Sequence, residues 1–332
     1  MAAAELEQRA DRLVARAGDR VLFEYVFKPD LPPLLSPRPY FHPVRTPGGI
    51  VITDHQPADH PWHLGISYAW PVVNPGGGAF PGGLNFWGGP TFVRGQGYQQ
   101  LDNNGQIRHL DWSGREEHLE WLDPKGTRVA VERRRLGVPE LAPDVASWYL
   151  DIETEITNSR PEALRFGSPT TEGRPMAGYS GLGWRGPESL RFAVVRLEGR
   201  PTREVGRAQA EPSTAGRGDV PPPRRARLPR PVPVPEDRWD AAAQDEMGIR
   251  ARWLALAGGG ATVAVAEHPD NPGVPNRWFV RTDVYPLVTS SPVFDRYLEL
   301  EPGGTLRLRH RLLVADGEWS GERLAGELRW EA

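Results

Sequence analysis

Apolar and polar residues alternate with a period of two along most of the chain. Every second residue of 148–156 is apolar except Thr154, and every second residue of 306–314 is apolar except His310. This period is that of a strand with one face in the core and one in water. A turn sequence at 301–304 separates the second segment from residues 297–300, which predicts a hairpin. Shorter runs occur at 22–27, 117–122, 128–135, 190–197, 250–257, 261–266 and 277–283.

Short strands punctuated by glycine and proline are typical of an all-β fold. Of the 332 residues, 37 are Gly and 35 are Pro, so turns are frequent and long helices are not expected. The pattern therefore predicts an all-β protein built as a large antiparallel β-sandwich.

The N-terminal residues have a different spacing. Four apolar residues between Leu6 and Val14 recur at helical intervals, so we expect a short helix, or an arm, over residues 1–18. The segment carries acidic residues and lacks the apolar stretch of a secretory signal. We therefore expect a cytoplasmic protein in which residues 19–332 form a single β-sandwich domain.

One segment inside that domain lacks the composition of a folded element. Residues 199–238 contain three consecutive prolines and no aromatic residue. Few large apolar groups are available there to offset the loss of chain entropy. We expect a mobile Pro/Arg-rich insertion, because strand-like sequence resumes on both sides.

Composition excludes several kinds of chemistry. The chain has no Cys, which excludes disulfides, thiolate metal sites and Cys nucleophiles. The formal net charge of −3 argues against nucleic-acid binding by bulk charge. No apolar run is long enough to span a bilayer. As partners we expect a small sugar-like molecule, no nucleic acid and no membrane, and a homodimer is the assembly considered.

Residues able to transfer protons are concentrated in the first third of the chain. Five of the eight His lie between residues 42 and 109, and the densest stretch is 54–65. His60 and His63 would point to opposite faces of a regular strand, but in a turn shaped by prolines the two rings could converge. With the Asn- and Trp-containing residues 85–95, they predict a polar small-molecule pocket with an aromatic floor.

Two later polar clusters each follow a strand-like run, where the loops of β-sandwiches often build sites. The first spans residues 170–175 and leads to 179–186, and the second spans 267–272 and leads to 276–281. Glu172 in the first cluster has the chemistry of a general acid or base, and it could equally pair with Arg174.

These clusters lead to one main hypothesis, an enzyme that processes a monosaccharide or an oxidised sugar derivative as an epimerase, lyase or hydrolase. Acid–base chemistry of this kind needs two groups near a C–O or C–H bond with pKa values near neutral. The candidate catalytic residues are His60, His63, Glu172, Glu267 and His268. The candidate substrate-binding residues are His42, Asn85, Trp87, Arg94, Tyr179, Arg185, Trp278 and Arg281. No metal and no other cofactor is expected under this hypothesis.

Two alternatives come from other classes. A metal enzyme would draw its ligands from His55, His60, His63 and His268 with Asp54 or Asp59, although no tight ligand motif is present. A non-catalytic sugar-binding protein would keep the Trp and Arg contacts and tolerate loss of the acid–base pair. Hydrocarbon oxidation ranks last, because it requires a redox metal or a flavin.

Seven motifs in these clusters together resemble one bacterial family. The motifs are PYFHPVRTP (39–47), DHPWHLG (59–65), NFWGGP (85–90), TEGRP (171–175), GLGWRGP (181–187), EHPDNP (267–272) and RWFVR (277–281). Members of this family are labelled methane oxygenase PmoA or simply a domain of unknown function. The resemblance covers residues 20–325 apart from the insertion.

A second resemblance is to the galactose mutarotase-like β-supersandwich. Glu267, residues 269–271 and the turn at 302–304 are similar in order and spacing to the late strands of that fold. The resemblance implies a supersandwich in which a Glu deprotonates the anomeric hydroxyl and a His protonates the ring oxygen. Glu267 matches that Glu, and no His of this chain is matched to that His.

Overall fold

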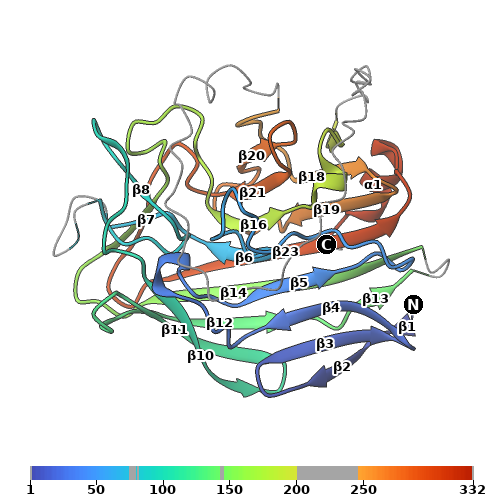
Figure 1. Ribbon diagram of the computed structural model, residues 1–332, viewed down its shortest axis with the longest axis horizontal. Helices are drawn as coiled ribbons and strands as arrows, with labels where there is room; N and C mark the ends of the chain where they lie inside the picture. The colour runs from blue at the N-terminus through green and yellow to red at the C-terminus, as the bar shows by residue number, and fades with distance from the viewer. Residues whose placement is uncertain (1, 75–79, 81, 143–145, 200–245, 331–332) are drawn as a thin grey trace, which may run out of the picture.

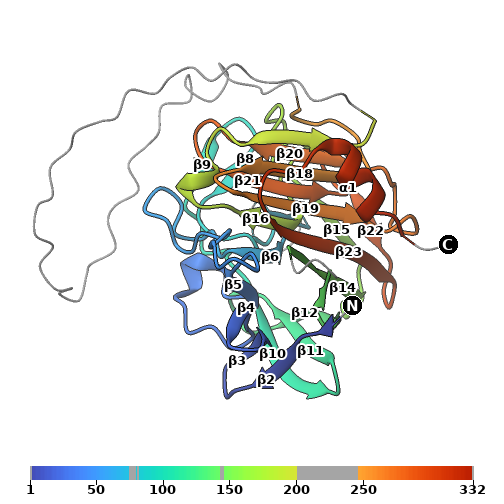
Figure 2. The same ribbon diagram turned by 90° about the vertical axis from the view of Figure 1, so that its right-hand side faces the viewer.

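The strands form two large antiparallel sheets that pack face to face (Figures 1 and 2). The computed structural model describes residues 2–74, 80, 82–142, 146–199 and 246–330. Residues 200–238 of the expected Pro/Arg-rich insertion at 199–238 lie outside this part of the chain.

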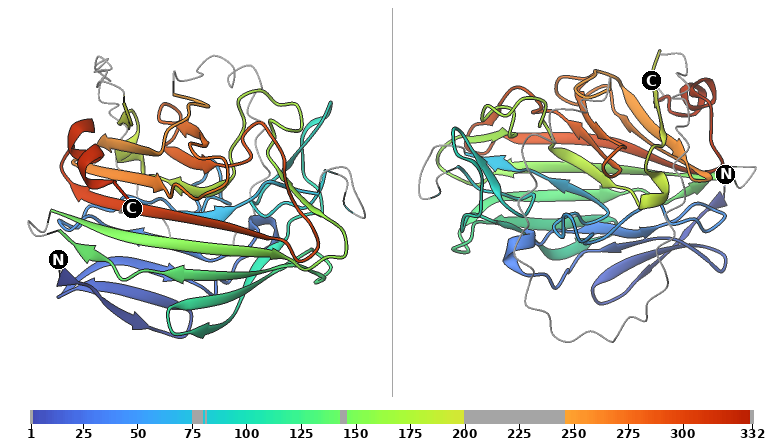
Figure 3. Two further views of the ribbon diagram at one scale, coloured as in Figure 1. Left: turned by 180° about the vertical axis from the view of Figure 1, so that it is seen from behind. Right: turned by 45° about the horizontal axis from the view of Figure 1, so that its top comes forward.

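The larger sheet has ten strands, with two short strands beside the main series. The main series runs β10 (Gln106–Ser113), β11 (Glu116–Leu122), β12 (Arg128–Leu136), β14 (Ser147–Asn158), β23 (Thr305–Asp316), β19 (Ala261–Glu267), β18 (Trp253–Gly258) and β17 (Val194–Leu197). The short strand β13 (Glu140–Leu141) pairs with β14 and with β1 (Ala2–Ala3). Figure 3 (left) shows β14 and β23 side by side across the sheet.

The second sheet has eight strands. Their order is β2 (Glu5–Gln8), β3 (Arg12–Ala17), β4 (Arg20–Val26), β5 (Tyr40–Val44), β6 (Ile66–Ala69), β16 (Gly181–Arg185), β21 (Leu287–Ser291) and β20 (Arg277–Arg281). Smaller elements are β7 (Val72–Val73), β15 (Leu164–Gly167) and β22 (Leu298–Leu300) in one sheet, the hairpin β8 (Thr91–Val93) and β9 (Gly97–Gln99), and the 3₁₀ turns η1 (Pro33–Leu35) and η2 (Glu188–Leu190).

One apolar core lies between the two large sheets. It takes alternate residues of the long strands, so that the strands β14 and β23 have one buried face. Trp148 of β14 meets Phe23 of β4 across the core, with ring centroids 5.9 Å apart. The period of two in the sequence thus arises from packing against the opposite sheet, and the predicted all-β antiparallel sandwich is confirmed.

The predicted N-terminal helix is wrong. The segment instead forms the hairpin of β2 and β3, in which Leu6 pairs with Ala15 and Gln8 with Leu13. β3 then pairs with β4 in the sheet, and Val14 of β3 is almost fully buried. Helical spacing of a few apolar residues was too weak a signal against the burial gained by extending the sheet.

The predicted hairpin of residues 297–300 with 306–314 is also wrong. β22 pairs with β15, and β23 pairs with β14 and β19. The turn at 301–304 is held against the end of β14, where Asn158 bonds to the backbone of Gly303 and Gly304. The turn therefore passes the chain from the small sheet into the large one.

The α-helix of the described residues, α1 (Gly321–Glu327), covers one end of the ten-stranded sheet (Figure 2). Its Leu324 packs with Trp319 on the outward residues of β18 and β19. In the part of the chain that the structure describes, no helix is long and apolar enough to cross a membrane.

Candidate active site

The candidate site lies on the outer face of the eight-stranded sheet. Alternation along β16 and β20 sends one set of residues into the core and the other to this face. On β20, Phe279 packs in a separate aromatic cluster on the outer face, whereas Trp278 belongs to the core between the sheets. Trp278 is fully buried and donates its indole N–H to the carbonyl of Ala251. Trp278 therefore does not line the site, because the alternation along β20 directs its side chain into the core.

A loop of successive turns brings His60 and His63 together above this face. The amide of His60 donates to Pro57 and that of His63 donates to His60, so the loop turns twice within a few residues. The two imidazoles stack with centroids 4.7 Å apart and an angle of 11° between their planes. We call them the imidazole pair. Their convergence in a proline-shaped turn agrees with the sequence prediction.

Both imidazoles are held by one ion pair, which Asp59 and Arg185 form. The guanidinium of Arg185 donates two hydrogen bonds to the Asp59 carboxylate, at 3.0 and 3.1 Å. Asp59 Oδ2 is 2.8 Å from Nδ1 of His60, and Arg185 Nη1 is 3.1 Å from Nδ1 of His63. The guanidinium also lies over the ring of Tyr285, 4.3 Å from its centroid. Each member of the pair is thus oriented by a different end of the same ion pair.

Burial and nearby charges shift the pKa values of His63 and Asp59. The pKa of His63 is held well below its usual value by burial and by the charges of His60, Arg185 and Arg38. Burial raises the pKa of Asp59, but hydrogen bonds from His60 and Arg185 outweigh it and hold that pKa below the usual range. The side chains of Asp59 and His60 are 43% and 17% exposed, so the site reaches solvent on this side.

Aromatic rings surround the imidazole pair. Trp87 lies edge-on to His63 at 5.8 Å, and Tyr285 lies 4.8 Å from His60. Trp87 also packs on Tyr179, which in turn meets Phe279. We define Trp62, Trp87, Tyr179, Phe279 and Tyr285 as the aromatic wall. Such rings can take the apolar face of a ring-shaped ligand.

Arginines and tyrosine hydroxyls border the aromatic wall. Arg281 lies 5.5 Å from the Phe279 ring, and its charge acts on Tyr285. Arg174 donates to the hydroxyl of Tyr98, which is 2.8 Å from the hydroxyl of Tyr179. These groups can hydrogen-bond to hydroxyl or carboxylate oxygens of a ligand.

The loop that carries Trp87 is shaped by Asn85. Its carboxamide oxygen accepts from the amides of Trp87 and Gly88, and its NH₂ donates to Gly89 O and Thr91 Oγ1. Asn85 is buried, and the carboxamide is used within the loop. Its expected role as a substrate contact is therefore replaced by one in positioning Trp87.

The two glycines of this loop permit close packing on Trp62. A Cβ added to Gly89 would lie 2.5 Å from the Trp62 ring, and Gly89 has φ +66°. Gly89→Ala is therefore expected to lower the free energy of unfolding. The left-handed backbone costs about 1–2 kcal/mol, and the clash with Trp62 adds to this cost. Gly114→Ala is the matched control, because Gly114 has φ +62° and open space around its Cβ position. Equal losses in urea unfolding of the two variants would contradict close packing on Trp62.

Three further predicted residues lie apart from the imidazole pair. Arg94 donates to the carbonyl of Thr171, and Glu172 accepts a hydrogen bond from Tyr297 at 2.6 Å. His42 is stacked on His55 and bonded to Thr53. The structure shows no contact of Arg94, Glu172 or His42 with His60 or His63 among the described residues.

Glu267 lies in the core between the sheets rather than at the outer face. Its carboxylate accepts from the amide and side chain of Asn276 and from the Ser290 hydroxyl, and it is 1% exposed. Ser290 is also bonded to Nε2 of His310, whose Nδ1 meets the hydroxyl of Tyr68. Burial raises the pKa of Glu267. Glu267 is thus one end of a buried polar chain.

The buried polar chain continues at the other end of the core. Arg134 lies over the ring of Tyr68 and donates to Glu132 and to the hydroxyl of Tyr25. Glu132 also accepts hydrogen bonds from Trp121 and Thr154, and Tyr25 donates to Glu117. Arg134 and both carboxylates are almost fully buried, so each depends on these partners.

His310 makes the stability of the protein sensitive to acid. Burial lowers its pKa to about 3, below the value of about 6.5 in an unfolded chain. On acidification the unfolded chain therefore takes up this proton first, so the contribution of His310 is present above about pH 6.5 and is lost as the pH falls toward 3. At about pH 5 the loss is expected to be about 2 kcal/mol.

The comparison of wild type with His310→Gln isolates this effect, because the other titrating groups are common to both proteins. Urea unfolding between about pH 7.5 and 5 should show a loss that is about 2 kcal/mol smaller for the variant. Parallel pH profiles would contradict a neutral, buried His310.

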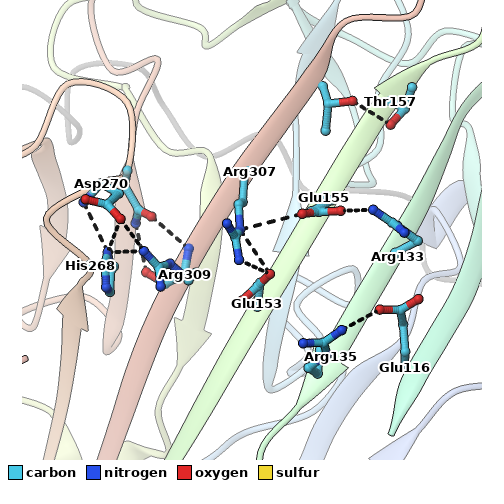
Figure 4. Close-up of polar contacts among 12 residues, drawn as sticks. Glu116, Arg133, Arg135, Glu153, Glu155, Thr157, His268, Asp270, Arg307 and Arg309 are labelled. Atoms are coloured by element: carbon cyan, nitrogen blue, oxygen red, sulfur yellow. Dashed lines mark hydrogen bonds and ion pairs between the residues drawn. The ribbon is translucent and has the colours of Figure 1, made fainter. Parts of the chain in front are cut away.

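His268 lies on the outer face of the ten-stranded sheet, beside Arg309 of β23 (Figure 4). Its Nδ1 is 2.7 Å from Arg309, and Asp270 contacts both side chains. A hollow on the same face is lined by Glu116, Arg133, Arg135, Glu153, Glu155 and Arg307. These residues pair with one another, as Figure 4 shows, so their charges are compensated.

Asp59, His60 and His63 are neighbours, but the predicted metal ligands among the described residues form no group that could hold an ion. Among the residues the structure describes, no three His, Asp or Glu side chains are close enough to hold one ion. The Nδ1 atoms of His60 and His63 are both engaged by the Asp59–Arg185 ion pair rather than turned to a metal position. The arrangement therefore offers no support for the metal-enzyme alternative.

Sequence reasoning missed several residues of the site. Asp59 is a candidate there only as a metal ligand, and Trp62, Phe279 and Tyr285 are not among the candidate site residues. The period of two in RWFVR (277–281) carried a usable signal, since it places Phe279 and Arg281 on one face and Trp278 on the other.

Comparison with known proteins gives a family without an assigned activity. Residues 12–329 match DUF6807, described as a family of unknown function. No curated protein matches the chain. The oxygenase label that members of the resembling family carry receives no support from this family description.

Three solved structures are similar to the chain. They are a polysaccharide lyase (10% identity, TM-score 0.33, 98% of this chain and 34% of that one), an α-galactosidase from Lactobacillus brevis (9%, 0.37, 95% and 40%) and a galactose mutarotase related enzyme from Lactobacillus acidophilus (11%, 0.34, 96% and 99%). The chain thus spans well under half the length of the first two. At these TM-scores the likenesses carry no argument about activity.

Proposed function

The chain belongs to DUF6807, and we propose that it is a carbohydrate-processing enzyme whose acid–base groups are His60 and His63. One observation carries the proposal: two stacked imidazoles, each held through Nδ1 by the Asp59–Arg185 ion pair, lie against an aromatic wall. Histidine is the side chain that most readily exchanges protons near neutral pH.

The surroundings of the imidazole pair support a carbohydrate as the substrate. Trp87 and Tyr285 offer flat apolar surfaces beside the two imidazoles. Tyr179 and Arg281 add groups able to bond to hydroxyl oxygens. A ligand with one apolar face and a rim of hydroxyls, such as a sugar ring, fits both features.

The proposal narrows the set of functional residues predicted from the sequence. It retains His60 and His63 as the groups that face the reacting atoms, and Trp87, Tyr179, Arg185 and Arg281 for binding and positioning. Glu267, Glu172 and His268 lie in three other places and have no part in it.

The experiment is a turnover screen with the full-length protein. Monosaccharides, keto-sugars and sugar acids are incubated with wild type and followed by NMR. His60→Ala and His63→Gln are each expected to lower turnover of a converted sugar by about 10²-fold or more. His268→Ala is the matched control and should keep wild-type turnover, because it lies on the opposite face.

Two results would contradict the proposal. Full turnover by both imidazole variants would place the chemistry elsewhere. A sugar that the wild type binds at this site but never alters would instead support the non-catalytic binding alternative.

A further inference from the structure

We infer that His60 and His63 carry their protons on opposite nitrogens, so that the pair removes a proton next to the carbonyl group of an open-chain or keto carbohydrate. In this assignment His60 is the proton acceptor and His63 is a neutral N–H donor to the carbonyl oxygen. The inference rests on the proposed function and adds to it a reaction class and a substrate class.

The hydrogen bond to Asp59 fixes the proton of His60. Asp59 receives two hydrogen bonds from Arg185, which favours the ionised carboxylate. An ionised carboxylate can only accept a hydrogen bond. The hydrogen between Asp59 Oδ2 and His60 Nδ1, 2.8 Å apart, therefore belongs to His60. A neutral His60 then carries its lone pair on Nε2, which is the nitrogen that can act as a base.

Arg185 fixes the opposite arrangement in His63. A guanidinium has five N–H donors and no acceptor. The contact of 3.1 Å between Arg185 Nη1 and His63 Nδ1 is therefore a bond that His63 accepts. The proton of the neutral His63 ring must lie on Nε2. A second proton on Nδ1 would point at the guanidinium, with the charge of Arg38 also nearby, so the ring stays neutral.

The stacking places the two Nε2 atoms on the same side. Both Nδ1 atoms point to the Asp59–Arg185 ion pair, and the ring planes are only 11° apart. One carbon separates Nδ1 from Nε2 in an imidazole and the two nitrogens point in widely different directions, so both Nε2 atoms point away from the ion pair. The lone pair of His60 and the N–H of His63 are therefore carried by stacked rings whose centroids are 4.7 Å apart.

A base and a neutral N–H donor suit the formation of an enolate. His60 Nε2 takes the proton from the carbon next to the carbonyl, and the C–H electron pair becomes a C=C bond. The carbonyl π electrons move to oxygen, where the N–H of His63 stabilises the charge and keeps its own proton. Return of the proton from His60 to carbon reverses the electron flow. Nothing is oxidised or reduced overall.

The same pair is poorly suited to opening a sugar ring by acid catalysis. That reaction needs a group which gives its proton to the ring oxygen. A neutral imidazole is a very weak acid, so His63 can polarise an oxygen but does not readily protonate it. The geometry therefore favours a carbonyl substrate over mutarotation.

The first arm of the test reads the tautomers directly and needs no substrate. Wild-type protein labelled with ¹⁵N in histidine is measured by NMR from about pH 6 to 9, with His60→Gln and His63→Gln used to assign the signals. Neutral His60 should be protonated on Nδ1 and neutral His63 on Nε2. The same tautomer in both rings, or a doubly protonated His63 near pH 7, would overturn the inference whatever the enzyme converts.

The second arm reads the reaction. A carbonyl-containing sugar that the wild type converts is incubated in D₂O, and deuterium is expected at the carbon next to the carbonyl. His60→Gln should abolish this exchange, and His63→Gln should slow it by about 10²- to 10³-fold. Conversion without deuterium incorporation would overturn the carbonyl assignment and leave the proposed function standing, whereas absence of conversion of any sugar would remove the proposed function itself.

Discussion

Replacing Arg134 with Met is expected to lower the free energy of unfolding by about 3–5 kcal/mol. Arg134 is nearly fully buried and is the cation that faces Glu132 in the core. Its loss leaves that carboxylate without a compensating charge and removes the bond to the Tyr25 hydroxyl. Denaturant unfolding monitored by tryptophan fluorescence measures the change.

The neighbouring residue provides the control. Arg135 is next in the same strand, β12, but points outward and forms an exposed ion pair with Glu116. Arg135→Ala should therefore change stability by no more than about 1 kcal/mol. Similar losses in the two variants would show that the buried polar chain does not carry the stability assigned to it.

Asp59→Asn is expected to lower the turnover of a converted sugar by about 10²- to 10⁴-fold while leaving the fold intact. An asparagine offers one acceptor oxygen where the carboxylate offers two, so it cannot hold His60 and both guanidinium donors in the present way. His60 then loses its fixed tautomer. The effect is measured as kcat on the sugar found with wild type.

A matched trio on the other side of the molecule serves as the control for Asp59. Asp270 contacts His268 and Arg309 much as Asp59 contacts His60 and Arg185 (Figure 4). Asp270→Asn should leave kcat unchanged, because that trio has one ring contact, with Trp330, and no second imidazole among the described residues. Equal loss in both variants would point to a general effect of carboxylate removal rather than to the imidazole pair.

The strands were predictable where burial of one face alone determined the pattern of apolar residues. β14 and β23 are long, regular and half-buried, so their period of two appears directly in the sequence. The N-terminal hairpin was not predictable, because its apolar spacing fits a helix and only the presence of β4 favours extension. The pairing of β22 with β15 was not predictable either, because a turn sequence does not show that the strands on its two sides pair with each other.

The site was predictable in part for similar reasons. Prolines in residues 54–65 exclude a regular strand, and this made the convergence of His60 and His63 foreseeable. Glu267 and His268 are both candidate catalytic residues in the sequence, but adjacent residues of a strand point to opposite faces. One therefore lies in the core and the other on the outer surface.

The position of a bound carbohydrate tests the central claim most directly. A sugar identified in the turnover screen is co-crystallised with a slow variant, His60→Gln, and the complex is solved. We predict that the sugar lies between Trp87 and Tyr285, with an oxygen within hydrogen-bond distance of His63 Nε2. A sugar seated instead on the outer face of the ten-stranded sheet, near His268 and Arg309, would contradict the account.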